Sequence, residues 1–72
     1  MAFTVAEIDD IFTYHAPRGD QPERYVKIRE AARTLALVII ANTPASADQT
    51  ASIRLLRESV FTANASIALE KD

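Results

Sequence analysis

The sequence of 72 residues contains no cysteine, no tryptophan, one glycine and one histidine. Without cysteine the chain has neither disulfides nor thiolate metal sites, and the single His15 excludes a cluster of several histidines around a metal ion. Carboxylates paired at hydrolytic spacing, phosphate-binding loops and dinucleotide fingerprints are also missing. We therefore expect a protein that is not an enzyme and that uses no metal and no other cofactor.

Long apolar runs and a strong net charge are missing as well. The longest uncharged apolar run, residues 35–41, is far shorter than the roughly 20 residues that a membrane-spanning helix needs. The N-terminus lacks the basic region and apolar block of a secretory signal. The net charge of −2 argues against general affinity for nucleic acid. These features favour a cytoplasmic protein that binds neither membranes nor DNA or RNA polymers.

Apolar residues at steps of three and four predict a helix over residues 21–42. This stripe consists of Tyr25, Ile28, Ala32, Leu35 and Ile39. Pro22 suits the first helical turn, and Asp20 with Glu23 has the spacing of a capping box. The residues around Pro44 then end the helix.

A second stripe predicts a helix over residues 47–69, which begins after a Ser46 cap paired with Gln49. Its members are Ile53, Leu56, Val60, Ala63 and Ile67. The short connection makes the two helices antiparallel. Residues 1–20 form an N-terminal arm with a helical turn, attached to the body by Phe3 and Phe12, followed by a loop. The predicted fold is all-α: one domain over residues 1–72, an antiparallel helical hairpin with a short helical arm.

Both predicted helices carry more apolar side chains than two packed helices can cover. These extra residues include Leu37, Ile40, Phe61 and Leu69. Left in solvent they would form a contiguous apolar patch, which marks an association surface. We therefore expect a homo-oligomeric helical bundle.

The candidate binding residues lie between residues 14 and 33. Tyr14 shares a loop with His15 and Pro17, directly before a basic helix start. An aromatic ring there can stack on a nucleobase, and cations from Lys27, Arg29 and Arg33 can pair with phosphate. Each has a plainer alternative: Tyr14 packs on its own hairpin, His15 is structural, and the cations form a solvated helix face.

Three pieces of the sequence resemble a known family. They are Phe-Thr-Tyr-His-Ala-Pro-Arg-Gly-Asp-Gln-Pro-Glu-Arg-Tyr (12–25), Ile28-Arg29-Glu30-Ala31-Ala32 and Ala63-Asn64-Ala65-Ser66-Ile67-Ala68. With them the chain resembles the bacteriophage anti-CBASS nucleotide-sponge family, whose hairpin domain also occurs in certain anti-Thoeris sponges. The resemblance covers about residues 11–69, and its most specific parts are Tyr-His-Ala-Pro and Asp-Gln-Pro-Glu-Arg-Tyr.

This resemblance implies a homohexamer that sequesters cyclic di- and trinucleotide second messengers without cleaving them. Such a protein acts in the host cytoplasm and silences the immunity that those messengers trigger. Tyr14 resembles the family's base-stacking tyrosine, and Arg29 stands where the family has a basic residue from a neighbouring subunit. Ala31 and Leu69 depart from the family, which often has threonine and arginine there, so the trinucleotide contacts stay open. The alternative function is a structural or protein-interaction hairpin without a small-molecule ligand.

Overall fold

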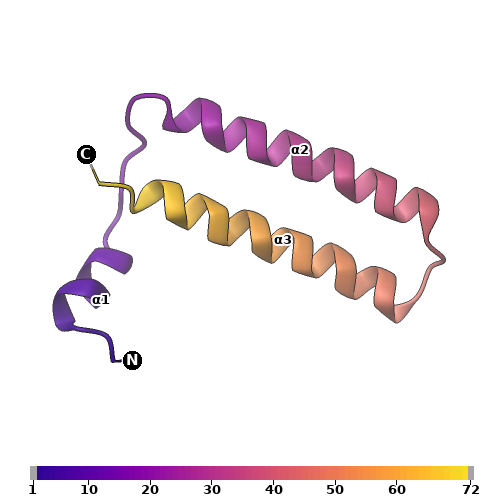
Figure 1. Ribbon diagram of the computed structural model, residues 1–72, viewed down its shortest axis with the longest axis horizontal. Coiled ribbons are helices and arrows are strands. Elements are labelled where there is room, and N and C mark those ends of the chain that lie inside the picture. Colours follow the sequence, from indigo (N-terminus) through magenta and orange to yellow (C-terminus); the bar gives the residue numbers. More distant parts are fainter. Residues whose placement is uncertain (1, 72) are drawn as a thin grey trace.

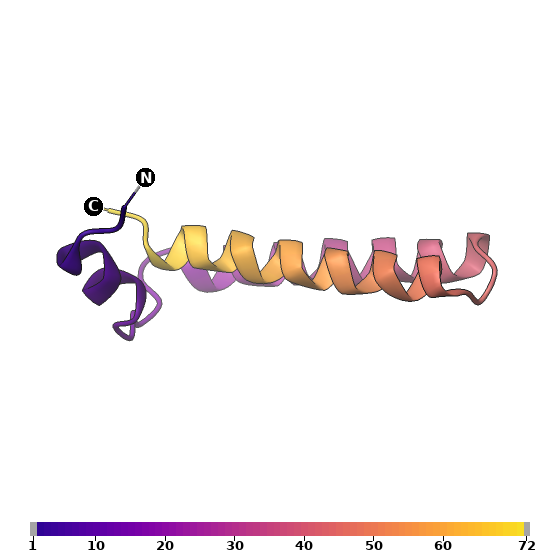
Figure 2. The ribbon, with the colours of Figure 1, turned by 90° about the horizontal axis from the view of Figure 1, so that it is seen from below.

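The computed structural model describes residues 2–71, and these form three helices and no strand. The helices are α1 (Val5–Ile11), α2 (Gln21–Asn42) and α3 (Ala47–Ala68). Figure 1 shows α2 and α3 running antiparallel, joined by residues 43–46, with α1 beyond the open end of the hairpin. In the side view of Figure 2, α1 again lies apart from the layer that the two long helices form. The predicted all-α hairpin with an N-terminal helical arm is confirmed.

The start of α3 follows its sequence signal, whereas the start of α2 does not. The Ser46 hydroxyl accepts a hydrogen bond from the backbone N–H of Gln49 at 3.1 Å, as predicted. The predicted capping bond of Asp20 is wrong, because its side chain makes no bond to the first turn of α2. Its backbone (φ −88°, ψ 5°) is outside the extended region that capping residues adopt. The Asp20 carboxylate instead lies 3.3 Å from Arg24.

Helix α1 is held by a complete capping box. The Thr4 hydroxyl accepts a hydrogen bond from the Glu7 N–H at 3.1 Å, and the Glu7 carboxylate accepts one from the Thr4 N–H at 3.2 Å. The prediction that Phe3 and Phe12 attach this arm to the body is wrong, since their exposed fractions are 67% and 81%. Polar side chains occupy the open end of the hairpin, so the two rings find no apolar surface there.

The interface between α2 and α3 uses the predicted stripe of α3 and a slightly different stripe of α2. All five predicted residues of α3 are buried or half-buried. On α2, Ala36 is half-buried and the predicted Leu35 is 48% exposed. Both residues lie one turn beyond Ala32, and the smaller side chain occupies the interface, which lets the helices approach closely.

A single chain leaves most of its apolar side chains in solvent. Within residues 2–71, only Ile67 and Gln21 are buried. The accessible surface of 5826 Å² exceeds the value of about 4,400 Å² for a compact monomer of 7.9 kDa by about 1,400 Å². The radius of gyration is 15.6 Å, where a compact chain of this length has about 11 Å. The single chain is therefore less compact than a typical folded monomer of its size.

The exposed apolar residues of the hairpin lie mainly on its far half. They are Val26, Leu35, Leu37, Val38, Ile40, Leu55 and Phe61. Leu69, which we predicted to be exposed with Leu37, Ile40 and Phe61, is half-buried, because it ends α3 beside the polar contacts at the open end. Within the described chain, no helix has both the length and the apolar character that crossing a bilayer requires.

Candidate functional site

Tyr14 lies in the loop between α1 and α2 and is 84% exposed. The predicted alternative, in which it packs on its own hairpin, is wrong for the single chain. The loop is fixed just beside it, because Nε2 of His15 lies 2.7 Å from the Asp10 carbonyl oxygen, which accepts the hydrogen bond. The Asp10 carboxylate in turn lies 3.0 Å from Nζ of Lys71. His15 therefore has a structural role, and the Tyr14 ring projects from an ordered loop.

The other end of this loop is held by a group of four residues that we call the C-terminal clamp: Arg18, Gln21, Arg24 and Glu70. Gln21 is 3% exposed, and its Nε2 donates to the Ile67 carbonyl at 2.9 Å and to Oε1 of Glu70 at 3.3 Å. Its Oε1 accepts a hydrogen bond from the Arg18 N–H at 2.9 Å. The loop is thus tied to the end of α3.

Arg24 and Glu70 form the charged part of the clamp. Nη1 of Arg24 lies 3.1 Å from Oε2 of Glu70, and Nη2 contacts Oε1, so the pairing is bidentate. The guanidinium of Arg18 also donates to the Glu70 carbonyl oxygen. The hydrogen bonds from Arg24, then from Gln21, hold the pKa of Glu70 below its usual value. Sequence reasoning did not find the Arg24–Glu70 pair, because the pairing is set by the ends of two helices, at residues 46 positions apart.

The remaining predicted residues, Pro17 and the three cations of α2, are exposed. Lys27 lies at the edge of a shallow hollow shared with Ile28 and Ile67. Arg29 and Arg33 lie along a different hollow, a groove between α2 and α3. Arg29, Arg33 and Lys27 therefore do not line one common pocket in a single chain.

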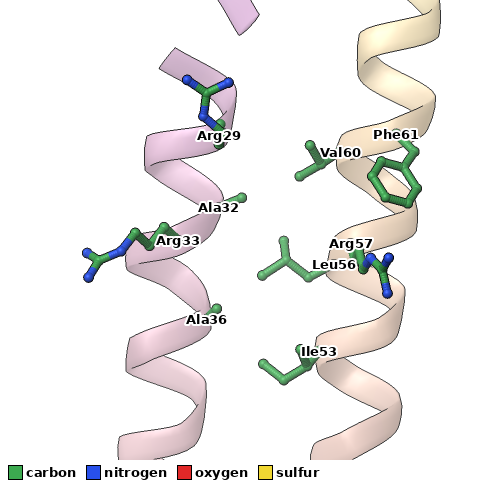
Figure 3. A pocket seen from close by; sticks show the side chains of 9 residues that line it. All are labelled: Arg29, Ala32, Arg33, Ala36, Ile53, Leu56, Arg57, Val60 and Phe61. Carbon is green, nitrogen blue, oxygen red and sulfur yellow. The ribbon is translucent and has the colours of Figure 1, made fainter. Parts of the chain in front are cut away.

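That groove, which we call the apolar groove, has a volume of about 300 Å³. Figure 3 shows Ala32 and Ala36 of α2 pointing toward the larger side chains of α3 across it. Those side chains are Ile53, Leu56 and Val60. Three arginines lie at its edges, and Figure 3 shows the Arg33 guanidinium directed away from α3.

Arg57 and Phe61 form one edge of the apolar groove, and sequence reasoning missed this pair. The Arg57 guanidinium carbon lies 5.3 Å from the centre of the Phe61 ring, within the range of a cation–π contact. The spacing of four residues on one helix face was the signal that predicts such a contact. The pair keeps a cation beside an apolar surface.

Tyr14 and Arg29, the two residues expected to contact one ligand, do not meet within one chain. Among residues 2–71, neither makes a hydrogen bond, ion pair or ring contact with the other. Tyr14 lies at the open end of the hairpin, whereas Arg29 lies eight residues into α2, about 12 Å along its axis. The two side chains therefore do not contact each other in the single chain. In the described part of the chain, no group of three or more metal-ligating side chains is gathered at one place.

Replacing Glu70 with glutamine is expected to reduce the acid sensitivity of the fold. Because the pKa of Glu70 is lowered in the folded chain, the clamp stabilises the protein fully above the ordinary value near 4.5. That stabilisation is lost as the pH falls through the lowered pKa. Thermal unfolding between pH 3 and pH 7 should show a lower Tm for Glu70→Gln at neutral pH and a smaller fall on acidification.

Glu30→Gln provides the control, since Glu30 is an exposed carboxylate on α2 that is not part of the clamp. It should leave both the Tm at neutral pH and its acid dependence close to those of the parent. Equal acid profiles for the parent and Glu70→Gln would contradict the clamp as a source of stability.

Comparison with known proteins adds no relative to this picture: no family model, no curated protein and no solved structure matches the chain.

Proposed function

We propose that the protein is a sponge that binds cyclic di- and trinucleotide second messengers and holds them without cleaving them. In a bacterial cytoplasm this removes the messengers that trigger antiphage immunity. The observation that carries the proposal is the 84% exposed Tyr14 ring on a loop fixed at both ends. The resemblance of residues 12–25 to the anti-CBASS nucleotide sponges supports the class of ligand.

The chemistry of such a ligand matches these residues. A cyclic dinucleotide offers two flat bases and two phosphates that stay charged at physiological pH. A site for it needs a ring that stacks on a base, cations for the phosphates and a surface that excludes water. Tyr14 supplies the ring, and Arg29 with Lys27 and Arg33 supplies exposed cations. In our proposal, Tyr14 comes from one subunit and Arg29 from another.

Assembly into a homo-oligomer, by resemblance a hexamer, is part of the proposal. Two observations support it: the accessible surface is about 1,400 Å² larger than that of a compact monomer, and seven large apolar residues along α2 and α3 are between 37% and 62% exposed. Stable interfaces between proteins bury about 800 Å² per partner. One or two interfaces of ordinary size would therefore cover this excess.

The protein is expected to leave its ligand intact. The chain has one histidine, and the Nε2 of His15 is engaged with the Asp10 carbonyl, which supports the expectation that this imidazole does not activate water at phosphorus. Incubation with a panel of cyclic di- and trinucleotides, followed by denaturation and chromatography, should return the full amount of unchanged ligand. A linear product that grows with time would show that the protein is an enzyme.

Calorimetric titration with the same panel separates the sponge from the structural hairpin. Binding of at least one cyclic nucleotide, at a ratio of ligand to chain set by the oligomer, supports the sponge. The structural alternative draws on the same exposed apolar residues, and it becomes the better account if none of the panel binds.

A further inference from the structure

Helix α1 has an apolar face that its own chain leaves uncovered. Val5, Ile8 and Ile11 are 77%, 39% and 41% exposed, and they recur at steps of three along the helix. Within residues 2–71, only α2 and α3 pack against each other. Isolated helices shorter than about 12–15 residues are marginal in water, so a helix of seven residues needs a partner for its apolar face. The capping box fixes the N-terminal end of α1 but does not cover this face.

The opposite side of α1 is the side that faces its own hairpin. At about 100° per residue, Asp10 lies on the side away from Ile8. Asp10 is held by Lys71 at 3.0 Å, and its carbonyl oxygen is held by His15 at 2.7 Å. These contacts keep α1 at the open end of the hairpin with Val5, Ile8 and Ile11 turned away. The same contacts keep it off the apolar groove of its own chain, which lies farther along α2.

The apolar groove is complementary to α1 in apolar surface and in charge. Its floor is apolar, and Arg29, Arg33 and Arg57 stand at its edges. Glu30 and Glu58, the carboxylates next to these arginines in the sequence, do not line it. The groove therefore suits an apolar ridge that carries negative charge along its sides.

Helix α1 provides such a ridge. The first basic residue of the chain is Arg18, and the residues before it carry only the negative charges of Glu7, Asp9 and Asp10. On the helix, Glu7 and Asp9 flank the apolar face on its two sides. Docking Ile8 between α2 and α3 would bring these carboxylates to the arginines at the edges.

We infer that α1 of one copy of the chain docks in the apolar groove of a second copy, with Ile8 over Ala32 and the carboxylates of Glu7 and Asp9 at the arginine edges. The occupant is a second copy because the chain exposes about 1,400 Å² more surface than a compact monomer, enough for an interface of ordinary size. The inference rests on the homo-oligomer of the proposed function. The inference also adds detail to the proposed function. Tyr14 follows α1 by three residues, so docking of α1 would carry Tyr14 toward a neighbour's Arg29 at the groove edge.

Ile8→Asp tests the docking, and Ala6→Asp is its matched control, since it adds the same charge to the other side of α1. Light scattering coupled to size exclusion, over a dilution series, gives the mass and the concentration at which the assembly dissociates. Ile8→Asp should raise that concentration at least tenfold, whereas Ala6→Asp should leave it within about twofold. Circular dichroism at a concentration where both variants are assembled should show the hairpin helices intact, because α1 does not pack on them.

A charge exchange gives an independent test. Asp9→Arg and Arg33→Asp should each weaken the assembly several-fold, and the double variant should regain most of the loss. An Ile8→Asp variant that assembles like the parent would overturn the inference, as would a double variant that is weaker than either single one. Calorimetry with cyclic nucleotides on the unchanged protein is read separately. If the parent protein binds a cyclic nucleotide while Ile8→Asp assembles as the parent does, the proposed sponge stands and the docking of α1 is rejected.

Discussion

Replacing Ile40 with aspartate is expected to break the assembly into monomers that retain little folded structure. Ile40 is 51% exposed in the single chain, on the far half of the hairpin, where Leu37 and Val38 are also about half exposed. An interface that covers them would bury the new charge without a partner, which costs several kcal/mol. Since about 1.4 kcal/mol is tenfold in an equilibrium constant, dissociation should become favoured by a hundredfold or more.

Size exclusion with light scattering at low micromolar concentration measures the mass of the assembly directly, and Ile40→Leu is the control. That change keeps apolar volume at the site and should preserve the mass of the assembly. Leu37→Asp should behave as Ile40→Asp does. A parent protein that runs as a stable, well-folded monomer at the same concentration would refute the argument from exposed apolar residues.

Replacing Tyr14 with alanine is expected to weaken cyclic dinucleotide binding by about fivefold to a hundredfold per site. Stacking on an aromatic ring contributes roughly 1–3 kcal/mol per base, and Tyr14 has no packing role in its own chain that would be lost. Calorimetric titration measures the change. The loss should be larger if both bases of one ligand stack on symmetry-related copies of Tyr14.

Two further variants separate stacking from charge. Tyr14→Phe keeps the ring and should lose little affinity. Arg29→Ala should lose affinity because a phosphate contact disappears, and Arg29→Lys should retain much of it. None of these changes alters the α2–α3 interface, so the hairpin helices should stay intact, and the two Tyr14 variants should also keep the mass of the assembly constant. If Tyr14→Ala binds cyclic nucleotides as tightly as the parent, Tyr14 does not stack on a base, and the structural hairpin becomes the better account.

The helices could be predicted from the sequence because their signals are local. The period of the apolar stripes placed α2 at residues 21–42, and the Ser46 cap placed the start of α3. The choice of Leu35 over Ala36 was wrong because both lie within one turn of the same stripe, and only the approach of α3 decides between them. The predicted cap at Asp20 was wrong because the side chain is of a capping type, but the backbone of Asp20 does not adopt the extended geometry that capping requires.

The site was less predictable because its parts are joined through contacts distant in the sequence. The exposure of Tyr14 follows from His15 and Gln21, which fix the two sides of its loop. Gln21 is polar and was assigned to the ordinary first turn of a helix, yet it is 3% exposed against the Ile67 carbonyl. No local pattern indicates that pairing. In our proposals the surfaces that contact Tyr14 and α1 belong to a second copy, which no pattern within one chain can place.

The hairpin closes at both ends by very different means, and this has a kinetic consequence. Residues 43–46 join α2 to α3 directly, whereas the C-terminal clamp joins residues 46 positions apart. Because closing a short loop costs less entropy, we expect the helices to pair from that connection outward and the clamp to form last. In the proposed oligomer, association between chains would then follow as a concentration-dependent step. For the proposed sponge, the capacity to capture a messenger would therefore rise faster than the amount of protein early after synthesis begins.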